Sequence, residues 1–259
     1  MITLVCGTLI LGPLESTATQ PVSPSPSASQ RAEKREKLLT FFTGRFRVIG
    51  CEPDSGNPYS GSVVITRQGQ QLLVQELING SSRTGTGVIT FEPETPTLEV
   101  GFGKSGLSAG YEPGNLDGQR QPRASGWVDP AGNKLSDRNR LGMEVWYNDQ
   151  PAPSPAQAQT KLDHASRNRM PPDLLGVYAG KYRIIGEETG TGRPYTGRLE
   201  VKLTGERLNI NGWIDGKRNS GELVAEFLPS KEPVLTLRCR VGRQSMGAGS
   251  FLPVKKIPL

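Results

Sequence analysis

The residues that could do chemistry are few, and this limits the kinds of site the chain can build. The 259 residues include one histidine, His164, and three cysteines, Cys6, Cys51 and Cys239. Because the histidine lies in a Pro-rich segment, a Ser-His-Asp or Cys-His catalytic site within either half of the chain is excluded. The same counts exclude zinc sites that are rich in histidine, that use four cysteines, or that combine two cysteines with two histidines. We therefore expect no metal, no cofactor and no enzyme activity.

Two of the cysteines leave a structural question open. Cys51 and Cys239 lie in different halves of the chain, at positions that do not correspond to each other. A disulfide between them would join the two halves in an oxidising compartment. Two buried, reduced thiols are the alternative.

Carboxylates are the remaining chemical candidates. Glu52 and Glu188 each precede a tyrosine, Tyr59 and Tyr195, by the same spacing. A glycosidase needs two carboxyl groups about 5–9.5 Å apart, and each half offers one, so such a site would have to be shared. In the alternative interpretation, each glutamate bonds the backbone of a long turn, and the Pro-Tyr pair packs that turn against a barrel mouth.

These matched residues belong to an internal repeat. Residues 44–61 return as residues 180–197 at a constant offset of 136, and nine of the 18 aligned positions are identical. A repeat of this kind indicates that one supersecondary unit occurs twice.

The residues around the repeats read as short antiparallel strands. Between residues 44 and 148 we expect eight of them, separated by Gly, Pro and Asn turns such as Asn79-Gly80, a strong hairpin signal. In residues 198–203, apolar and charged side chains alternate strictly, as they do in a strand with one buried face. The pattern predicts an all-β chain with two tandem antiparallel units, each an up-and-down barrel or a sandwich and the second incomplete, preceded by a short helix that ends in Leu38, Leu39, Phe41 and Phe42.

The second copy lacks counterparts of the last two strands of the first, at residues 124–128 and 142–147. An incomplete barrel exposes strand edges that other strands can join. Three explanations stay open: the second copy pairs with the first, it forms a homodimer through its open edge, or the reading frame is altered near residue 251.

Composition suggests how the chain is divided. Residues 2–14 are apolar but too short to cross a bilayer, which takes about 20 residues. We predict a signal segment at 1–18 with an upstream start, a disordered tether and helix start at 19–37, the first barrel at 38–150, a Pro-rich linker at 151–173 and the incomplete barrel at 174–259. The chain is therefore expected to be exported.

Several short motifs of the first copy resemble those of a group of uncharacterised exported bacterial proteins of lipocalin-like or avidin-like type. They lie at residues 44–50 (Gly-x-Phe-x-Val-x-Gly), 58–61 (Pro-Tyr-Ser-Gly), 100–103, 110–111, 125–127 and 142–146. The resemblance covers residues 44–148 and part of 180–241, and it implies a small barrel without implying an activity. Inside such a barrel, a ligand pocket would be lined by Phe102, Tyr111, Trp127 and Trp146. In the alternative, these side chains fill the core.

Two functions follow from this interpretation. The first is a non-enzymatic exported protein that holds a small apolar ligand inside the first barrel. The second is a structural or adhesive module that binds a protein or polysaccharide of the cell envelope through loops and the open sheet edge. Residues 174–259 carry 14 Lys/Arg against 8 Asp/Glu, net +6, but these charges are dispersed among acidic residues, so we expect no nucleic-acid partner.

Overall fold

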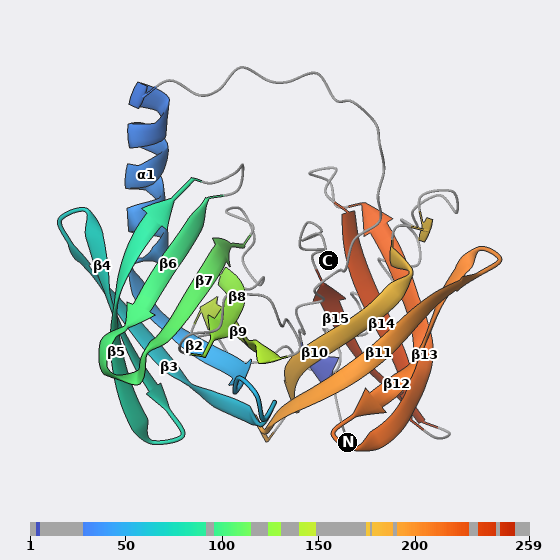
Figure 1. Cartoon of the computed structure of the whole chain (residues 1–259). Helices are drawn as coiled ribbons and strands as arrows, with labels where there is room; N and C mark the ends of the chain where they lie inside the picture. Colours follow the sequence, from blue (N-terminus) through green and yellow to red (C-terminus); the bar gives the residue numbers. More distant parts are fainter. Residues whose placement is uncertain are drawn as a thin grey trace. The chain divides into compact units, whose positions relative to one another are not determined.

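The computed structural model describes residues 4–5, 28–91, 96–114, 124–130, 140–148, 175–176, 178–188, 191–227, 233–241 and 244–251. The chain divides into two compact units (Figure 1). One unit contains residues 15–150, and the other contains residues 1–14 together with 151–259.

The first unit is a closed barrel of eight antiparallel strands, as the repeat pattern predicts. Each strand pairs with the next in sequence, and β9 closes the ring by pairing with β2. The strands are β2 (Gly44–Cys51), β3 (Pro58–Gln68), β4 (Gln71–Ile78), β5 (Ser81–Thr90), β6 (Thr97–Phe102), β7 (Leu107–Pro113), β8 (Ala124–Asp129) and β9 (Gly142–Asn148). A short 3-10 helix, η1 (Gly103–Ser105), joins β6 to β7.

Alternation along each strand separates the barrel interior from the outer surface. In β4, Leu72 and Val74 are fully buried, whereas Gln71 and Gln75 are exposed. Asn79 and Gly80 both have positive φ, 48° and 82°. This conformation is that of the tight hairpin predicted between β4 and β5, because a two-residue turn there needs left-handed backbone.

Helix α1 (Ala28–Phe42) packs its C-terminal turns onto one end of the barrel, as the sequence predicts. Leu38, Leu39, Phe41 and Phe42 are all buried. The Phe42 ring meets the Trp146 ring edge-on, with centroids 6.4 Å apart. At the helix surface, Arg67 donates two hydrogen bonds to Glu36, at 2.8 and 3.0 Å. The helix thus closes the barrel end at which β2 begins.

The second unit is a twisted antiparallel sheet. Its four consecutive strands β10 (Gly180–Glu188), β11 (Pro194–Thr204), β12 (Arg207–Ile214) and β13 (Lys217–Phe227) continue into β14 (Pro233–Val241) and β15 (Gln244–Phe251). Among the described residues these strands form no closed barrel, so a second barrel of lipocalin type is not confirmed.

One edge of this sheet is covered, in contrast to the open edge expected there. The two-residue strand β1 (Leu4–Val5) pairs with β10, placing Leu4 opposite Glu188 and Val5 opposite Glu187. Residues from the predicted signal segment therefore contribute a strand to the second unit. No helix in the described ranges is long and apolar enough to cross a membrane.

The packing of α1 leads to a first prediction. Phe42→Ala should lower the free energy of unfolding of the first barrel by about 3–5 kcal/mol, because it leaves a cavity beside Trp146. Hydrogen exchange of β9 amides in the full chain measures this loss. Lys37→Ala is the control, since Lys37 is exposed and only pairs with Glu33, and it should stay within about 0.5 kcal/mol. Equal effects of the two substitutions would show that the helix does not stabilise the barrel.

Candidate functional site

The barrel interior contains a cluster of polar side chains arranged around Glu144. Five residues form a single row across five neighbouring strands, in which Tyr59 (β3) lies opposite Gly50 (β2), Gly50 opposite Glu144 (β9), Glu144 opposite Gly126 (β8) and Gly126 opposite Tyr111 (β7). The alternation of large and small residues lets both tyrosines lean over a glycine toward the same carboxylate.

The two glycines are needed for this arrangement. A Cβ added to Gly50 would lie 2.5 Å from the Tyr59 ring, and one added to Gly126 would lie 2.7 Å from the Tyr111 ring and 2.1 Å from the Gly110 carbonyl oxygen. These distances are shorter than van der Waals contact, so only glycine leaves room for the phenols to reach Glu144.

Glu144 is fully buried and accepts hydrogen bonds at both carboxylate oxygens. Tyr59 and Arg83 donate to Oε1, and Tyr111 donates to Oε2. The Trp146 indole also donates to Oε2, at 3.4 Å. Donors on both oxygens compensate the loss of hydration that a buried carboxylate suffers.

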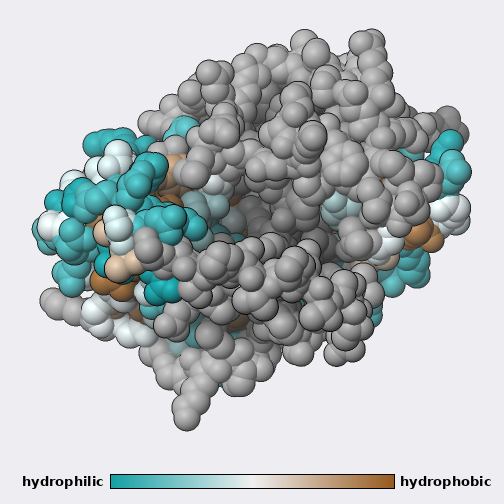
Figure 2. Space-filling model, turned by 90° about the horizontal axis from the view of Figure 1, so that it is seen from above, coloured by the Kyte–Doolittle hydropathy of each residue, from teal (hydrophilic) through white to brown (hydrophobic). Residues whose placement is uncertain are grey.

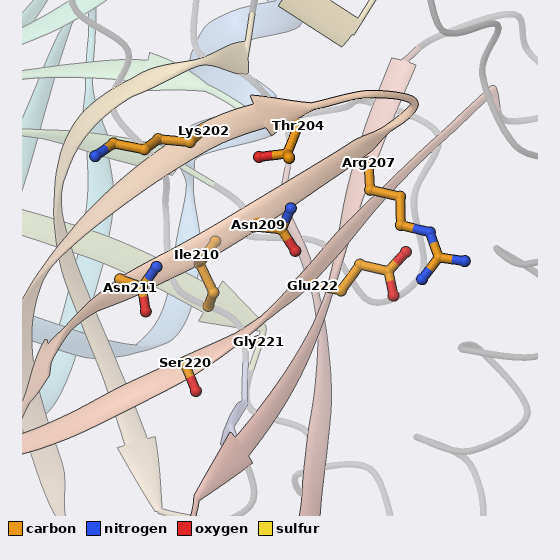
Figure 3. A pocket seen from close by; sticks show the side chains of 9 residues that line it. All are labelled: Lys202, Thr204, Arg207, Asn209, Ile210, Asn211, Ser220, Gly221 and Glu222. Atoms are coloured by element: carbon orange, nitrogen blue, oxygen red, sulfur yellow. The ribbon is translucent and has the colours of Figure 1, made fainter.

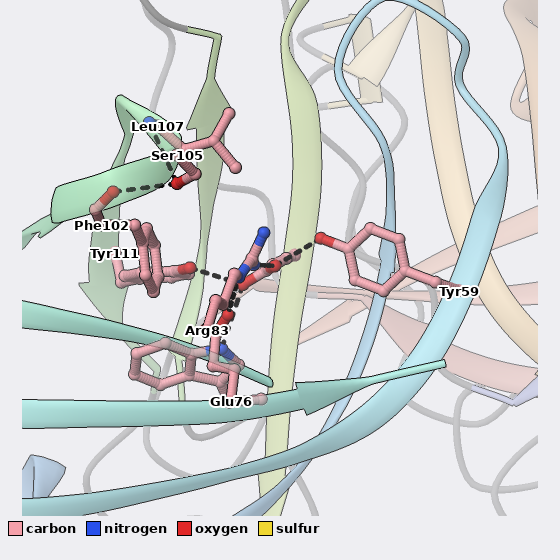
Figure 4. Close-up of polar contacts among 9 residues, drawn as sticks. Tyr59, Glu76, Arg83, Phe102, Ser105, Leu107 and Tyr111 are labelled. Atoms are coloured by element: carbon pink, nitrogen blue, oxygen red, sulfur yellow. Dashed lines mark hydrogen bonds and ion pairs between the residues drawn. The ribbon is translucent and has the colours of Figure 1, made fainter. Parts of the chain in front are cut away.

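Arg83 reaches Glu144 from the opposite wall of the barrel. It lies on β5, four strands away from β9 in a ring of eight. Its Nε donates to Glu76, its cross-strand neighbour on β4, and its Nη2 donates to Glu144. The guanidinium also stands over the Phe102 ring, 4.5 Å from the centroid. Figure 4 shows Tyr59 and Tyr111 approaching from two sides, with Arg83 and Glu76 in the same layer.

The cluster contains two carboxyl groups and one guanidinium. The hydrogen bonds and ion pairs of Glu76 compensate only part of its loss of hydration. Glu76 is 1% exposed, and its Oε1 has no hydrogen-bond partner in the described part of the chain. Arg83 alone keeps some contact with solvent, with 20% of its side chain exposed against none for either glutamate.

Burial and mutual charge shift the acidity of the whole cluster. Burial first, and then the negative charge on Glu144, raise the pKa of Glu76 to about 8 despite its ion pair with Arg83. Burial, reinforced by Glu144, also raises the pKa of Tyr59 and of Tyr111 well above 10. Burial acts to lower the pKa of Arg83, but the charges of Glu144 and Glu76 outweigh it and raise that pKa. Arg83 thus stays charged while Glu76 holds a proton near neutral pH.

The structure brings three of the four predicted pocket residues together. Phe102, Tyr111 and Trp146 are buried in one apolar cluster, and the Tyr111 and Trp146 rings lie 4.0 Å apart. Trp127 lies on the opposite face of β8 from the inward-facing Gly126 and is only partly buried. Tyr111 and Trp146 fill the barrel between the polar cluster and α1, whereas Phe102 lies at the other end, opposite Leu107 on β7 and under the Arg83 guanidinium.

The four residues predicted at the matched turns, Glu52, Tyr59, Glu188 and Tyr195, do not form one site. Glu52 is exposed and accepts a hydrogen bond from the Ser55 hydroxyl at 2.9 Å, which fits the interpretation that it bonds its own turn. Tyr59, by contrast, is buried and belongs to the cluster around Glu144. In the second unit Tyr195 is buried, whereas the side chain of Glu188 lies outside the described residues.

No cysteine or histidine among the described residues belongs to the cluster. Cys51 is buried and is not part of a disulfide in the described structure. The side chain of Cys239 and the whole of His164 lie outside the described residues. Within those residues, no group of three or more His, Cys, Asp or Glu side chains could hold a metal ion.

Sequence reasoning missed Glu76, Arg83 and Glu144, although one signal was present. Glu76 occupies the inward phase of β4, in register with Leu72 and Val74. A charged residue on the strand face that otherwise carries apolar residues indicates a buried partner, since charges are rarely buried alone.

Known proteins do not assign a role to this cluster. No protein-family model, curated protein or solved structure matches the chain. The similarity to lipocalin-like exported proteins therefore stays a prediction from motifs, and the chemistry of the cluster has to be inferred from its own geometry.

The raised pKa of Glu76 predicts a pH-dependent stability. An acid whose pKa rises on folding binds more protons in the folded state, so stability should fall as pH increases from about 4.5 to about 8. Glu76→Gln cannot ionise and should lack this part of the pH dependence. Glu99→Gln, at an exposed position on β6, is the matched control. Urea unfolding of the three proteins at pH 5, 7 and 9 measures the effect, and parallel pH profiles for all three would contradict it.

Removing the cation of the cluster should be more damaging than removing a surface cation. Arg83→Met leaves two buried carboxyl groups without a counter-charge and should cost about 3–5 kcal/mol at pH 8. The loss should shrink at pH 5, where Glu76, whose pKa is raised to about 8, is protonated. Arg67→Met removes an exposed partner of Glu36 and should cost at most about 1 kcal/mol. Hydrogen exchange in β9 distinguishes the two, and equal losses would mean that the cluster does not stabilise the barrel.

Proposed function

We propose that the first barrel is a non-enzymatic binding module for a small ligand that is largely apolar and donates a hydrogen bond to Glu76. We further propose that the protein is exported, as its apolar N-terminal residues and its Pro/Ser-rich tether suggest.

The observation that carries this proposal is the unpartnered Oε1 of Glu76. A buried polar atom without a hydrogen bond costs about 1–3 kcal/mol. Most such atoms in folded proteins have a partner in the protein, in water or in a ligand. A ligand with a hydroxyl or amine at one end would supply the missing donor.

The position of the cluster indicates where the ligand would sit. Since Tyr111 and Trp146 fill the lumen on the α1 side, the ligand would enter from the other end, where Phe102 lies beside Arg83 and Arg83 retains contact with solvent. Two inward-facing residues near that mouth, Ile78 and Leu107, are only partly buried and pack against the core. They offer an apolar surface for the body of the ligand.

The hydrogen bonding of Glu144 favours binding over catalysis. Both of its oxygens already accept two donors, so it has little capacity left to act as a base or nucleophile. Glu76 is the one acidic group in the cluster with a free acceptor, and a single carboxyl group suits the anchoring of a ligand.

A native mass spectrum tests the proposal. The full chain, purified from an exporting host without refolding, should carry extra mass that leaves on activation. In Glu76→Gln the amide oxygen should stay on Arg83, and the amide NH2 group then replaces Oε1 and cannot accept a hydrogen bond, so the bound fraction should fall about tenfold. Glu99→Gln should keep it.

Two results would overturn the proposal. One is a bare wild-type chain, both as purified and after incubation with a small-molecule extract of the host. The other is equal retention of the extra mass by Glu76→Gln and Glu99→Gln, since the ligand would then bind away from the cluster.

A further inference from the structure

The outer face of the second unit carries an exposed tryptophan between two arginines. Arg198 (β11), Trp213 (β12) and Arg218 (β13) lie directly opposite one another in a single cross-strand row. Trp213 is 58% exposed, the most of any large hydrophobic residue in the described part of the chain. The described surface seen in Figure 2 is mostly hydrophilic, with small hydrophobic patches, so an exposed indole needs an explanation.

The two arginines are not compensated by neighbouring acids. Within the described ranges neither Arg198 nor Arg218 has an ion-pair partner, although nearby cations do. Lys202 pairs with Glu200 at 3.1 Å, and Arg193 pairs with Asp215 at 2.6 Å. The row therefore offers two guanidinium groups, each with donors for a carboxylate or similar anion, on either side of an aromatic face.

A hollow of about 520 Å³ lies on the same three strands. Its lining includes the outward-facing side chains of Lys202, Arg207, Asn209, Asn211, Ser220 and Glu222, seen in Figure 3. Asn211 and Trp213 share the outer face of β12. Amides, a hydroxyl and charged groups thus continue from the tryptophan along the strand, as hydrogen-bonding partners for a ligand rich in hydroxyl groups.

The first copy shows that the fold does not require these residues. The positions that correspond to Arg198, Trp213 and Arg218 at the offset of 136 are Ser62, Leu77 and Ser82, which form the same cross-strand row. The position of Lys202 holds Thr66 and that of Asn209 holds Leu73. The backbone arrangement is shared, so the arginines and the tryptophan are an addition specific to the second copy.

We propose that this outer face of β11 to β13 binds an acidic polysaccharide, of the kind built from uronic acids. The indole would stack on the face of a pyranose ring, while Arg198 and Arg218 bind carboxylates of the neighbouring sugars. Asn209 and Asn211 would bond ring hydroxyls in the hollow. Single-stranded nucleic acid is less suited, because it stacks successive bases on several aromatics, and Trp213 is the one exposed large aromatic among the described residues.

The test uses the full chain and a defined oligogalacturonate, with binding measured by calorimetry and by tryptophan fluorescence. The triple variant R198S/W213L/R218S installs the residues of the first copy and should weaken binding by about tenfold or more. Binding should also weaken at high salt, since it depends on exposed charges. The charge-matched control R31S/R45S removes two exposed cations of the first unit and should stay within about twofold of wild type.

Several outcomes would overturn this inference. They are no binding of the oligogalacturonate, equal binding of neutral dextran, tighter binding of an oligothymidylate, or equal weakening by the triple variant and its control. Circular dichroism of the triple variant verifies that it is folded. Glu76→Gln should bind the oligogalacturonate like wild type, which separates this site from the one proposed in the first barrel.

Discussion

The first barrel depends on one interaction that crosses its interior, the ion pair between Arg83 on β5 and Glu144 on the opposite strand β9. Neither charge could be buried alone, since the loss of hydration costs several kcal/mol per ion. The pair also constrains the strands that carry it. A shift of β9 by one residue would turn Glu144 outward and leave Glu76 as the one carboxylate beside Arg83 in the cluster. The phenols of Tyr59 and Tyr111 complete the hydrogen bonding of the carboxylate, and two glycines in the same row make room for them.

The two copies of the repeat place their charges on opposite faces of the same kind of sheet. In the first copy two ionisable side chains, Glu76 and Arg83, lie inside, and the corresponding positions of the second copy hold Gly212 and Asn219. In the second copy the distinctive charges lie outside, beside Trp213, where the first copy has serines. Because inward and outward positions alternate along a strand, either face can change while the other continues to hold the sheet together. This independence is compatible with the site proposed in the lumen of one repeat and the site proposed on the surface of the other.

Local patterns were enough to predict the strands of the first barrel, and they failed where closure of the ring decides the outcome. Asn79-Gly80 predicted its hairpin because the turn chemistry is contained in two residues. Arg83 and Glu144 are 61 residues apart, and their contact exists only because eight strands return to the starting strand. Trp127 was grouped with Trp146 by residue type, whereas strand phase places the small Gly126 inside and Trp127 on the other face. The sequence shows which residues of β8 and of β9 share a face of the strand, but it does not show which of the two faces points into the lumen.

The Gly–Tyr pair that both copies retain indicates which part of the cluster is structural. Gly50 faces Tyr59 in the first copy and Gly186 faces Tyr195 in the second, and in each a Cβ on the glycine would lie 2.5 Å from the tyrosine. The packing of the ring over the glycine therefore belongs to the shared sheet, whether or not a carboxylate is present. The buried arginine is different, because besides its neighbour Glu76 it uses an acceptor on the opposite wall, Glu144, which only the closed ring brings within reach. Among its described residues the second sheet does not close, and the position of Arg83 holds a neutral asparagine, Asn219, that bonds the backbone of Lys217 at 2.6 Å. In the first barrel, closure of the ring brings Glu144 to Arg83, and without Arg83 the Glu144 carboxylate could not be buried as a charge.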